Sequence, residues 1–161
     1  MHLIPPDSFP ELPAPVRATL VGRKCQIPVP WATRANAITG AFTARDAVEW
    51  AVACSVRDTS QILVLTAATG AVVDSLSRSA DATWIQRNGG KRWLFSRLIS
   101  QVPMSKLAFV PPDTTNENIV YYGAFLPKPS DHDGIEEVFL DKAGETFYFA
   151  RGKWISGGSS D

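Results

Sequence analysis

The sequence predicts an α+β fold, mostly an antiparallel β meander of hairpins with a short N-terminal helix. Residues 49–56, E-W-A-V-A-C-S-V, place the larger apolar side chains at every second position, a period typical of a half-buried strand. Residues 62–65, I-L-V-L, form a continuous apolar run that suits a central strand. Asn88-Gly89 lies between two aromatic-bearing runs and indicates a hairpin, because a tight type I′ turn needs positive φ at both central residues. On residues 49–56, one face would carry Trp50, Val52, Cys54 and Val56, and the other would carry Ala51, Ala53 and Ser55.

The size and charge of the chain exclude some classes of protein. Its 161 residues have the length of a single domain and can bury a core without metals or many cross-links. Sixteen basic and sixteen acidic residues cancel, so we expect no nucleic-acid partner, because that partner requires a positive surface. No apolar run approaches the roughly 20 residues of a membrane-spanning helix, so we expect no membrane span.

The N-terminal residues leave two locations open. The start, M-H-L-I-P-P-D-S-F-P-E-L, lacks the basic and then apolar regions of a signal peptide. Either the protein is cytoplasmic, or it is extracytoplasmic after removal of a signal, with Met1-His2 added in its place. We take the second as the expectation.

The positions of the prolines indicate the local structure of the N-terminal third. Five of the first fifteen residues are proline, so residues 1–12 are predicted to be an extended arm. A short helix follows from Pro13, with Pro15 in its first turn and Gly22 at its end. Its inward side chains would be Val16, Leu20 and Val21. Residues 27–31, I-P-V-P-W, are again extended.

The middle of the chain continues as strands and turns. Thr69-Gly70 is a predicted turn, and residues 71–76 form the next strand. In the Asn88-Gly89 hairpin, the register would bring Trp84 and Trp93 near each other across the strands. Residues 94–102 continue as strand or as a short helix, and Pro103 ends either one.

The C-terminal third ends in a hairpin that turns at Arg151-Gly152. Residues 119–125 are strand-like, and residues 157–161 form a flexible tail. Residues 134–141 fit a strand or a helix, and the helix would begin with a capping box of Asp133 and Glu136.

The two cysteines allow two interpretations. A Cys25–Cys54 disulfide would join the N-terminal segment to the sheet, whereas two buried thiols would act as small apolar residues in a reduced compartment. A catalytic thiol at Cys54 is not expected, because an apolar strand face raises the pKa of a thiol and hides it.

The segment S-D-H-D-G-I-E-E is the best candidate for chemistry. Asp131, His132 and Asp133 place carboxylate and imidazole groups together, which suits a divalent cation or a carboxylate–imidazole pair. In the structural alternative, Asp133 turns the chain and Gly134 adopts the turn's special backbone angles. The D-x-D-G fragment lacks the rest of an EF-hand loop.

The sequence contains no G-x-S-x-G elbow, no closely spaced zinc ligands and no complete phosphate-binding loop, so we expect no cofactor and no enzymatic activity. Exposed aromatic rings offer another function, because they can stack on sugars or anchor a protein partner. The candidate binding residues are Tyr121, Tyr122, Trp84 and Trp93. In the alternative, most of these rings belong to the core.

Several segments resemble a group of uncharacterised bacterial proteins with a G-x-F…W-A-V-x-C-S core and a D-H-x-G-I…G-K-W ending. The matching segments are R-K-C-Q-I-P, I-T-G-A-F-T-A-R-D-A-V-E-W-A-V-A-C-S, D-H-D-G-I-E-E-V-F-L-D-K-A and F-A-R-G-K-W-I. The resemblance spans residues 12–161 and consists of packing and turn signatures. Glu49 and Gly144 depart from the group, which has Asp and Ser there. Members of the group look exported, which favours the Cys25–Cys54 bridge, and no activity carries over.

Residues 38–65 also distantly resemble the strand–turn–strand hairpins of FG-GAP propeller repeats, some of which hold calcium. The equivalent turn here, residues 43–46, has one carboxylate beside an arginine, and calcium needs several oxygen ligands.

The leading hypothesis is therefore a non-enzymatic, extracytoplasmic single domain, residues 1–161, that binds a protein or a cell-wall glycan through its surface. The alternative is a hydrolase-like or metal-dependent activity centred on Asp131, His132 and Asp133.

Overall fold

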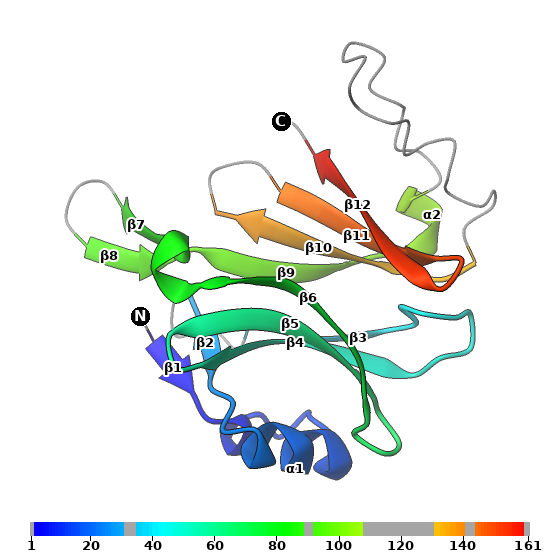
Figure 1. Ribbon diagram of the computed structural model, residues 1–161, viewed down its shortest axis with the longest axis horizontal. Coiled ribbons are helices and arrows are strands. Elements are labelled where there is room, and N and C mark those ends of the chain that lie inside the picture. The colour runs from blue at the N-terminus through cyan, green and yellow to red at the C-terminus, as the bar shows by residue number, and fades with distance from the viewer. Residues whose placement is uncertain (1, 31–34, 89–91, 108–130, 141–143, 160–161) are drawn as a thin grey trace.

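The computed structural model describes residues 2–30, 35–88, 92–107, 131–140 and 144–159 (Figure 1). These residues form one β-rich domain of three layers. An N-terminal layer with the helix α1 lies below a four-stranded sheet, the inner sheet, and a second four-stranded sheet, the outer sheet, lies above it. The predicted fold class is confirmed. No helix among the described residues is long and apolar enough to cross a membrane.

The inner sheet is antiparallel throughout and has the order β3-β4-β5-β6. Its strands are β3 (Ala37–Gly40), β4 (Glu49–Val56), β5 (Thr59–Thr66) and β6 (Val72–Ala80). The alternation predicted on β4 is confirmed, since Val52 and Cys54 face the N-terminal layer while Ala51 and Ala53 face the outer sheet. Both faces of β4 are buried, however, because a layer covers each side of the sheet. The prediction of a half-buried strand was wrong on this point.

The N-terminal layer contains β1 (His2–Ile4), the 3₁₀ helix η1 (Pro6–Ser8), α1 (Ala14–Gly22) and β2 (Ile27–Val29). The arm predicted to be extended therefore contains two short regular elements, and β1 pairs with β2. In α1, Val16 and Leu20 are buried as predicted. Val21 was wrongly predicted to face inward and is 46% exposed, because the helix turns it away from the sheet.

The outer sheet is antiparallel with the order β12-β11-β10-β9. Its strands are β9 (Arg97–Val102), β10 (Gly134–Phe139), β11 (Gly144–Ala150) and β12 (Lys153–Ser159). The ambiguous segment is thus a strand, because β10 pairs with a neighbour on each side, and the capping box does not form. The turn at Arg151-Gly152 is confirmed, with φ of 53° and 78°. Residues 157–159, predicted as part of the tail, pair with β11.

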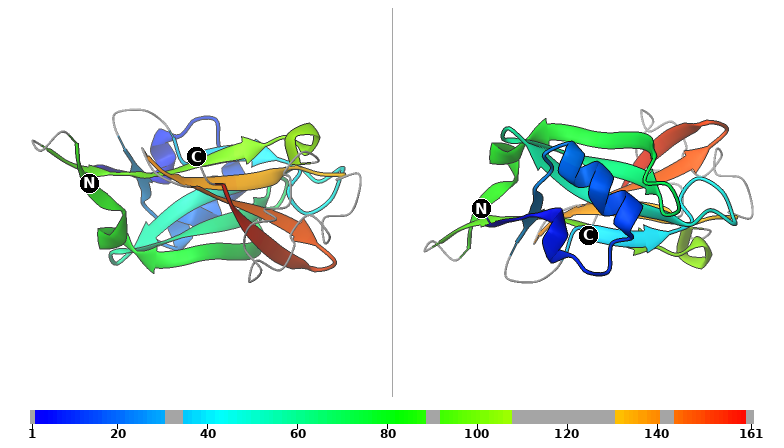
Figure 2. Two further views of the ribbon diagram at one scale, coloured as in Figure 1. Left: turned by 90° about the horizontal axis from the view of Figure 1, so that it is seen from above. Right: turned by 90° about the horizontal axis from the view of Figure 1, so that it is seen from below.

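A separate hairpin joins the two sheets in sequence. It consists of β7 (Ile85–Asn88) and β8 (Arg92–Phe95), follows the 3₁₀ helix η2 (Asp81–Trp84), and extends beyond one end of the sheets (Figures 1 and 2). The hairpin is confirmed, but its predicted register is wrong. Asn88 pairs with Arg92 inside the ladder and is not a turn centre, so Arg87 lies opposite Trp93, where Trp84 was expected. The short helix α2 (Met104–Leu107) follows β9.

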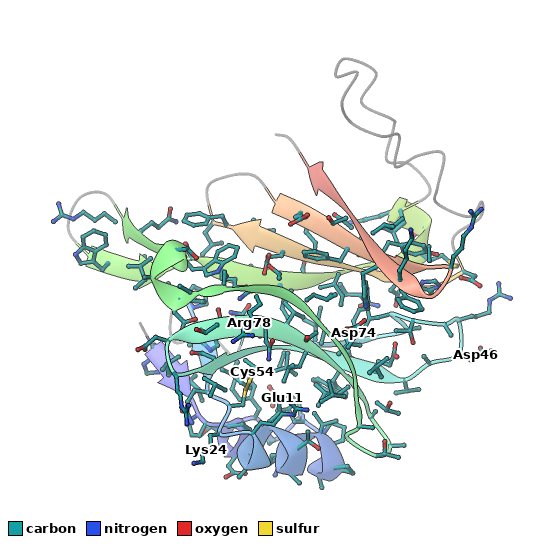
Figure 3. All side chains as sticks on the ribbon, in the orientation of Figure 1. Glu11, Lys24, Asp46, Cys54, Asp74 and Arg78 are labelled. Atoms are coloured by element: carbon teal, nitrogen blue, oxygen red, sulfur yellow. A yellow bond between two sulfur atoms is a disulfide. The ribbon has the colours of Figure 1, made fainter. Side chains whose placement is uncertain are left out.

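Two apolar clusters lie on the two faces of the inner sheet. The cluster facing the N-terminal layer contains Phe9, Leu12, Val16, Leu20, Cys25, Ile27, Val29, Val52, Cys54, Leu63 and Leu65. The cluster between the sheets contains Phe42, Ala51, Ala53, Ile62, Val64, Leu76, Ile99, Ile135 and Phe147. A Cys25–Cys54 disulfide joins the N-terminal layer to β4, as Figure 3 shows at Cys54.

Candidate functional site

The β7–β8 hairpin presents the most exposed aromatic ring among the large apolar side chains of the described residues. Trp93 on β8 is 62% exposed. Arg87 lies opposite it on β7, and its guanidinium carbon is 4.9 Å from the centroid of the Trp93 ring. Because directly opposed residues of an antiparallel pair share a face, the cation and the ring form one continuous surface. We call Trp93 and Arg87 the hairpin surface.

The base of the hairpin is fixed to the outer sheet by hydrogen bonds. The carbonyl oxygen of Trp84 accepts from the backbone N–H of Ser96 at 2.7 Å and from its hydroxyl at 2.6 Å. The side-chain amide of Gln86 donates to the carbonyl of Leu140 at 2.9 Å, and the N–H of Leu140 donates to the carbonyl of Ser96 at 2.9 Å. The hairpin surface is therefore held in a defined position relative to the sheets.

Trp84, a predicted binding residue, supports the hairpin from beneath. Its ring lies 4.8 Å from the guanidinium carbon of Arg97 and stacks on Phe139 with centroids 5.6 Å apart. Its indole N–H donates to the hydroxyl of Ser79 at 2.6 Å. Trp84 is partly buried, and both its face and its polar atom contact the protein. The structure does not bring it to Trp93.

Arg97 belongs to a buried charged network between the two sheets. It has no exposed surface, and its Nε donates to Glu137 Oε1 at 2.5 Å. Its remaining nitrogens donate to the hydroxyl of Ser60 and the carbonyl of Ser77, both at 2.7 Å. The hydroxyl of Ser77 also donates to Glu137. Burial lowers the pKa of Arg97 from its ordinary value, and the neighbouring Glu137 opposes that effect.

Asp81 extends this network toward the hairpin. It is 2% exposed, begins η2, and its Oδ2 accepts from the hydroxyl of Ser55 at 2.5 Å. Its charge favours the charged form of Arg97. The residues that carry the hairpin are thus tied to the inner sheet through Asp81 and to the outer sheet through Arg97.

The second candidate, the segment 131–133, leads directly into β10, an interior strand of the outer sheet. His132 is buried, and its Nδ1 lies 2.6 Å from Asp131 Oδ1, while its Nε2 lies 2.7 Å from the carbonyl oxygen of Phe149. Its ring stacks on Tyr148 with centroids 4.4 Å apart and an interplanar angle of 9°. The hydrogen bond from His132 lowers the pKa of Asp131 below its ordinary value.

Asp133 holds three parts of the chain together. Its carboxylate accepts from the backbone N–H groups of Ala41 and Met104, both at 3.2 Å, and from the side-chain amide of Gln101 at 2.7 Å. Gly134 is in β10 and lacks the positive φ expected of it. It is constrained by space instead, since a Cβ would lie 3.0 Å from the carbonyl oxygen of Phe147.

Of the predicted metal ligands, Asp131 and His132 thus pair with each other, while the carboxylate of Asp133 is occupied by donors from elsewhere in the chain. Within the described ranges, no three His, Cys, Asp or Glu side chains are grouped so that they could hold a metal ion. The remaining candidates, Tyr121 and Tyr122, lie outside the described residues, as does the predicted strand 119–125.

Sequence reasoning missed two buried polar residues that position the loops. Asn36 is 1% exposed, accepts from the N–H of Ile99 at 2.9 Å, and donates to the carbonyls of Pro28 and Arg97. Glu49 accepts from the backbone N–H groups of Phe42 and Thr43 at 2.8 and 2.9 Å. The partners of Asn36 lie up to 63 residues away in the sequence, so no local pattern could have indicated them, whereas those of Glu49 lie six and seven residues away.

No protein-family model matches the chain, no curated protein shows significant similarity to it, and no solved structure does so either.

Proposed function

We propose that this protein is a non-enzymatic, extracytoplasmic binding domain whose β7–β8 hairpin contacts a cell-wall glycan. One observation carries the proposal. Trp93 is 62% exposed on a hairpin that projects from the sheets, while the base of that hairpin is fixed by hydrogen bonds and by the buried network around Arg97.

The chemistry of the hairpin surface suits a sugar. The indole ring is a large flat apolar surface, and the C–H faces of sugar rings are apolar in the same way. The Arg87 guanidinium over the Trp93 ring is worth about 0.5–1 kcal/mol at an exposed site, which restricts the ring before a ligand arrives. A ring that is already ordered loses less conformational entropy on binding.

The Cys25–Cys54 disulfide supports the extracytoplasmic location. Disulfides form and persist in oxidising environments and are rare in the cytosol, where thiols are kept reduced.

A metal-dependent or hydrolase-like activity at residues 131–133 remains the alternative. Among the described residues, the Asp131–His132 pair is the feature that fits it. The other ring nitrogen of His132 and the carboxylate of Asp133, however, are held by protein partners. A cation there would have to displace those partners.

The test compares Trp93→Ala with Val73→Ala, since Val73 is also exposed, at 45%, but lies on β6 away from the hairpin. Co-sedimentation with insoluble cell-wall glycan should retain wild type and Val73→Ala. Trp93→Ala should bind at least about tenfold more weakly, as expected for loss of an aromatic anchor worth 1.4 kcal/mol or more. Its urea midpoint should stay near that of wild type, because an exposed side chain contributes little to stability.

Equal retention of Trp93→Ala and wild type would refute the role of the hairpin surface. If wild type binds a protein but no glycan, the proposed ligand is wrong and the partner of the hairpin surface is a protein.

A further inference from the structure

We infer that the glycan recognised by the hairpin surface is acidic, with a sugar carboxylate pairing with Arg87 while the sugar ring packs on Trp93. This inference rests on the proposed function and names the ligand class of the same surface.

The charge of the hairpin differs from that of the whole chain. The chain has no net charge, yet residues 85–95, I-Q-R-N-G-G-K-R-W-L-F, contain three basic residues and no acidic one. No aspartate or glutamate occurs between Asp81 and Asp113. A local excess of one sign of charge raises the concentration of oppositely charged ligands near the surface.

Arg87 is the basic residue of this hairpin whose side-chain position the structure describes. No carboxylate among the described residues forms an ion pair with it, and its guanidinium lies over the ring of Trp93. Arg97, only ten positions later, has its charge balanced by Glu137 inside the protein. The two arginines therefore differ in what they can do, and Arg87 is the one available to an outside anion.

Guanidinium chemistry favours a carboxylate as that anion. A guanidinium above an aromatic ring can still donate from its N–H edges, and its planar fork matches the two oxygens of a carboxylate. Because the Arg87 guanidinium carbon lies 4.9 Å from the Trp93 ring centroid, the two groups belong to one surface that a short oligosaccharide can span. A polymer of uronic acid offers both features on every unit, an apolar ring face and a carboxylate.

The experiment uses two forms of one polymer. Polygalacturonate carries a carboxylate on each sugar, and fully methyl-esterified polygalacturonate has the same backbone without the charge. Wild type should bind the acidic form up to about fivefold more tightly, the range of one exposed ion pair. This preference should disappear in about 1 M NaCl, where the screening length is roughly 3 Å.

Three variants assign the effect to residues. Arg87→Gln should bind the two polymers equally, at the wild-type affinity for the ester. Arg23→Gln removes the same charge from an exposed position next to α1 and should behave as wild type. Trp93→Ala should weaken binding to both polymers.

The outcomes separate the two proposals. If wild type binds insoluble cell-wall glycan but does not prefer the acidic polymer, the acidic ligand is wrong and the proposed function stands. If wild type binds neither polymer nor the cell-wall glycan, the proposed function itself fails. Arg87-dependent binding to phosphatidylglycerol vesicles that is as strong as binding to polygalacturonate would overturn the sugar as the ligand.

Discussion

Arg97 lies between the two sheets with no exposed surface, and its guanidinium contacts both of them. Glu137 meets it from β10 of the outer sheet, and Ser60 and Ser77 meet it from β5 and β6 of the inner sheet. A buried ion pair adds little net stability over apolar residues of the same volume, but it fixes which groups must face each other. At this end of the sandwich, hydrogen bonds to charged groups set the arrangement of the sheets.

Replacing one partner of this pair should be costly. Glu137→Gln keeps the side-chain shape but leaves the Arg97 charge buried without its counter-charge, so we expect a loss of about 3–5 kcal/mol in the free energy of unfolding. Equilibrium urea unfolding measures it. The double variant Arg97→Met with Glu137→Gln should lose less than the single variant, because neither charge is then left in the interior. A single-variant loss below about 0.5 kcal/mol would contradict this account.

The same residue shows what the sequence could not reveal. Charged side chains are mostly exposed, so nothing local marks Arg97 as buried. Its partner Glu137 is forty positions away, and the segment around Glu137 fitted a helix as well as a strand. The partners of the segment 131–133 were equally hidden. Its residue types suggested a metal, but their backbone partners include Ala41, which follows β3, and Phe149 in β11, and neither is adjacent to the segment in the sequence.

At the level of elements, strands, the helix and turns could be predicted from the sequence, because apolar periodicity and turn residues are local signals. The strands β4, β5 and β6, the helix α1 and the turn at Arg151-Gly152 follow from apolar spacing and turn residues. The register of the strand pairing was harder to predict. Asn88 belongs to the ladder and not to the turn, so Trp93 lies opposite Arg87 and not near Trp84, as was expected. The pairing that creates the hairpin surface could therefore not be deduced from the Asn-Gly signal.

The β5–β6 turn shows how tightly one element fixes another. Gly70 has φ of 68°, and a Cβ there would lie 2.2 Å from the carbonyl oxygen of Pro15 in the first turn of α1. Gly70→Ala should lower the free energy of unfolding by about 1–3 kcal/mol or more, since it combines an unfavourable φ with a backbone clash. Thermal and urea unfolding measure the change.

Gly22→Ala is the matched control for this prediction, because nothing lies within 4 Å of a Cβ at the end of α1. It should be neutral or stabilise the protein by up to about 1 kcal/mol through helix propensity. If Gly70→Ala were as well tolerated as Gly22→Ala, the turn and the helix would not be in the contact described.

For the whole molecule, the Cys25–Cys54 bridge is the covalent link between layers. It closes a sequence separation of 29 residues, for which the loss of chain entropy in the unfolded state predicts about 3–4 kcal/mol of stabilisation. The variant Cys25→Ala with Cys54→Ala should unfold at lower urea by the corresponding amount. Adding a reductant should shift wild type in the same way and leave the variant unchanged.

Intact mass after alkylation checks the premise of this prediction. Unreduced wild type should take up no alkyl groups even when unfolded, and reduced wild type should take up one on each cysteine. Two freely alkylated thiols in unreduced protein would show that the bridge is absent from the isolated protein.

The division of the layers along the chain bears on how the protein is made. The apolar cluster between the N-terminal layer and the inner sheet, and the cysteine pair within it, come from residues before position 73. The outer sheet begins only at Arg97. Synthesis proceeds from the N-terminus, so the segments of this first cluster are available to pack before the outer sheet is complete. Until then the opposite face of the inner sheet, with Ile62 and Val64, stays bare and can associate with another unfinished chain.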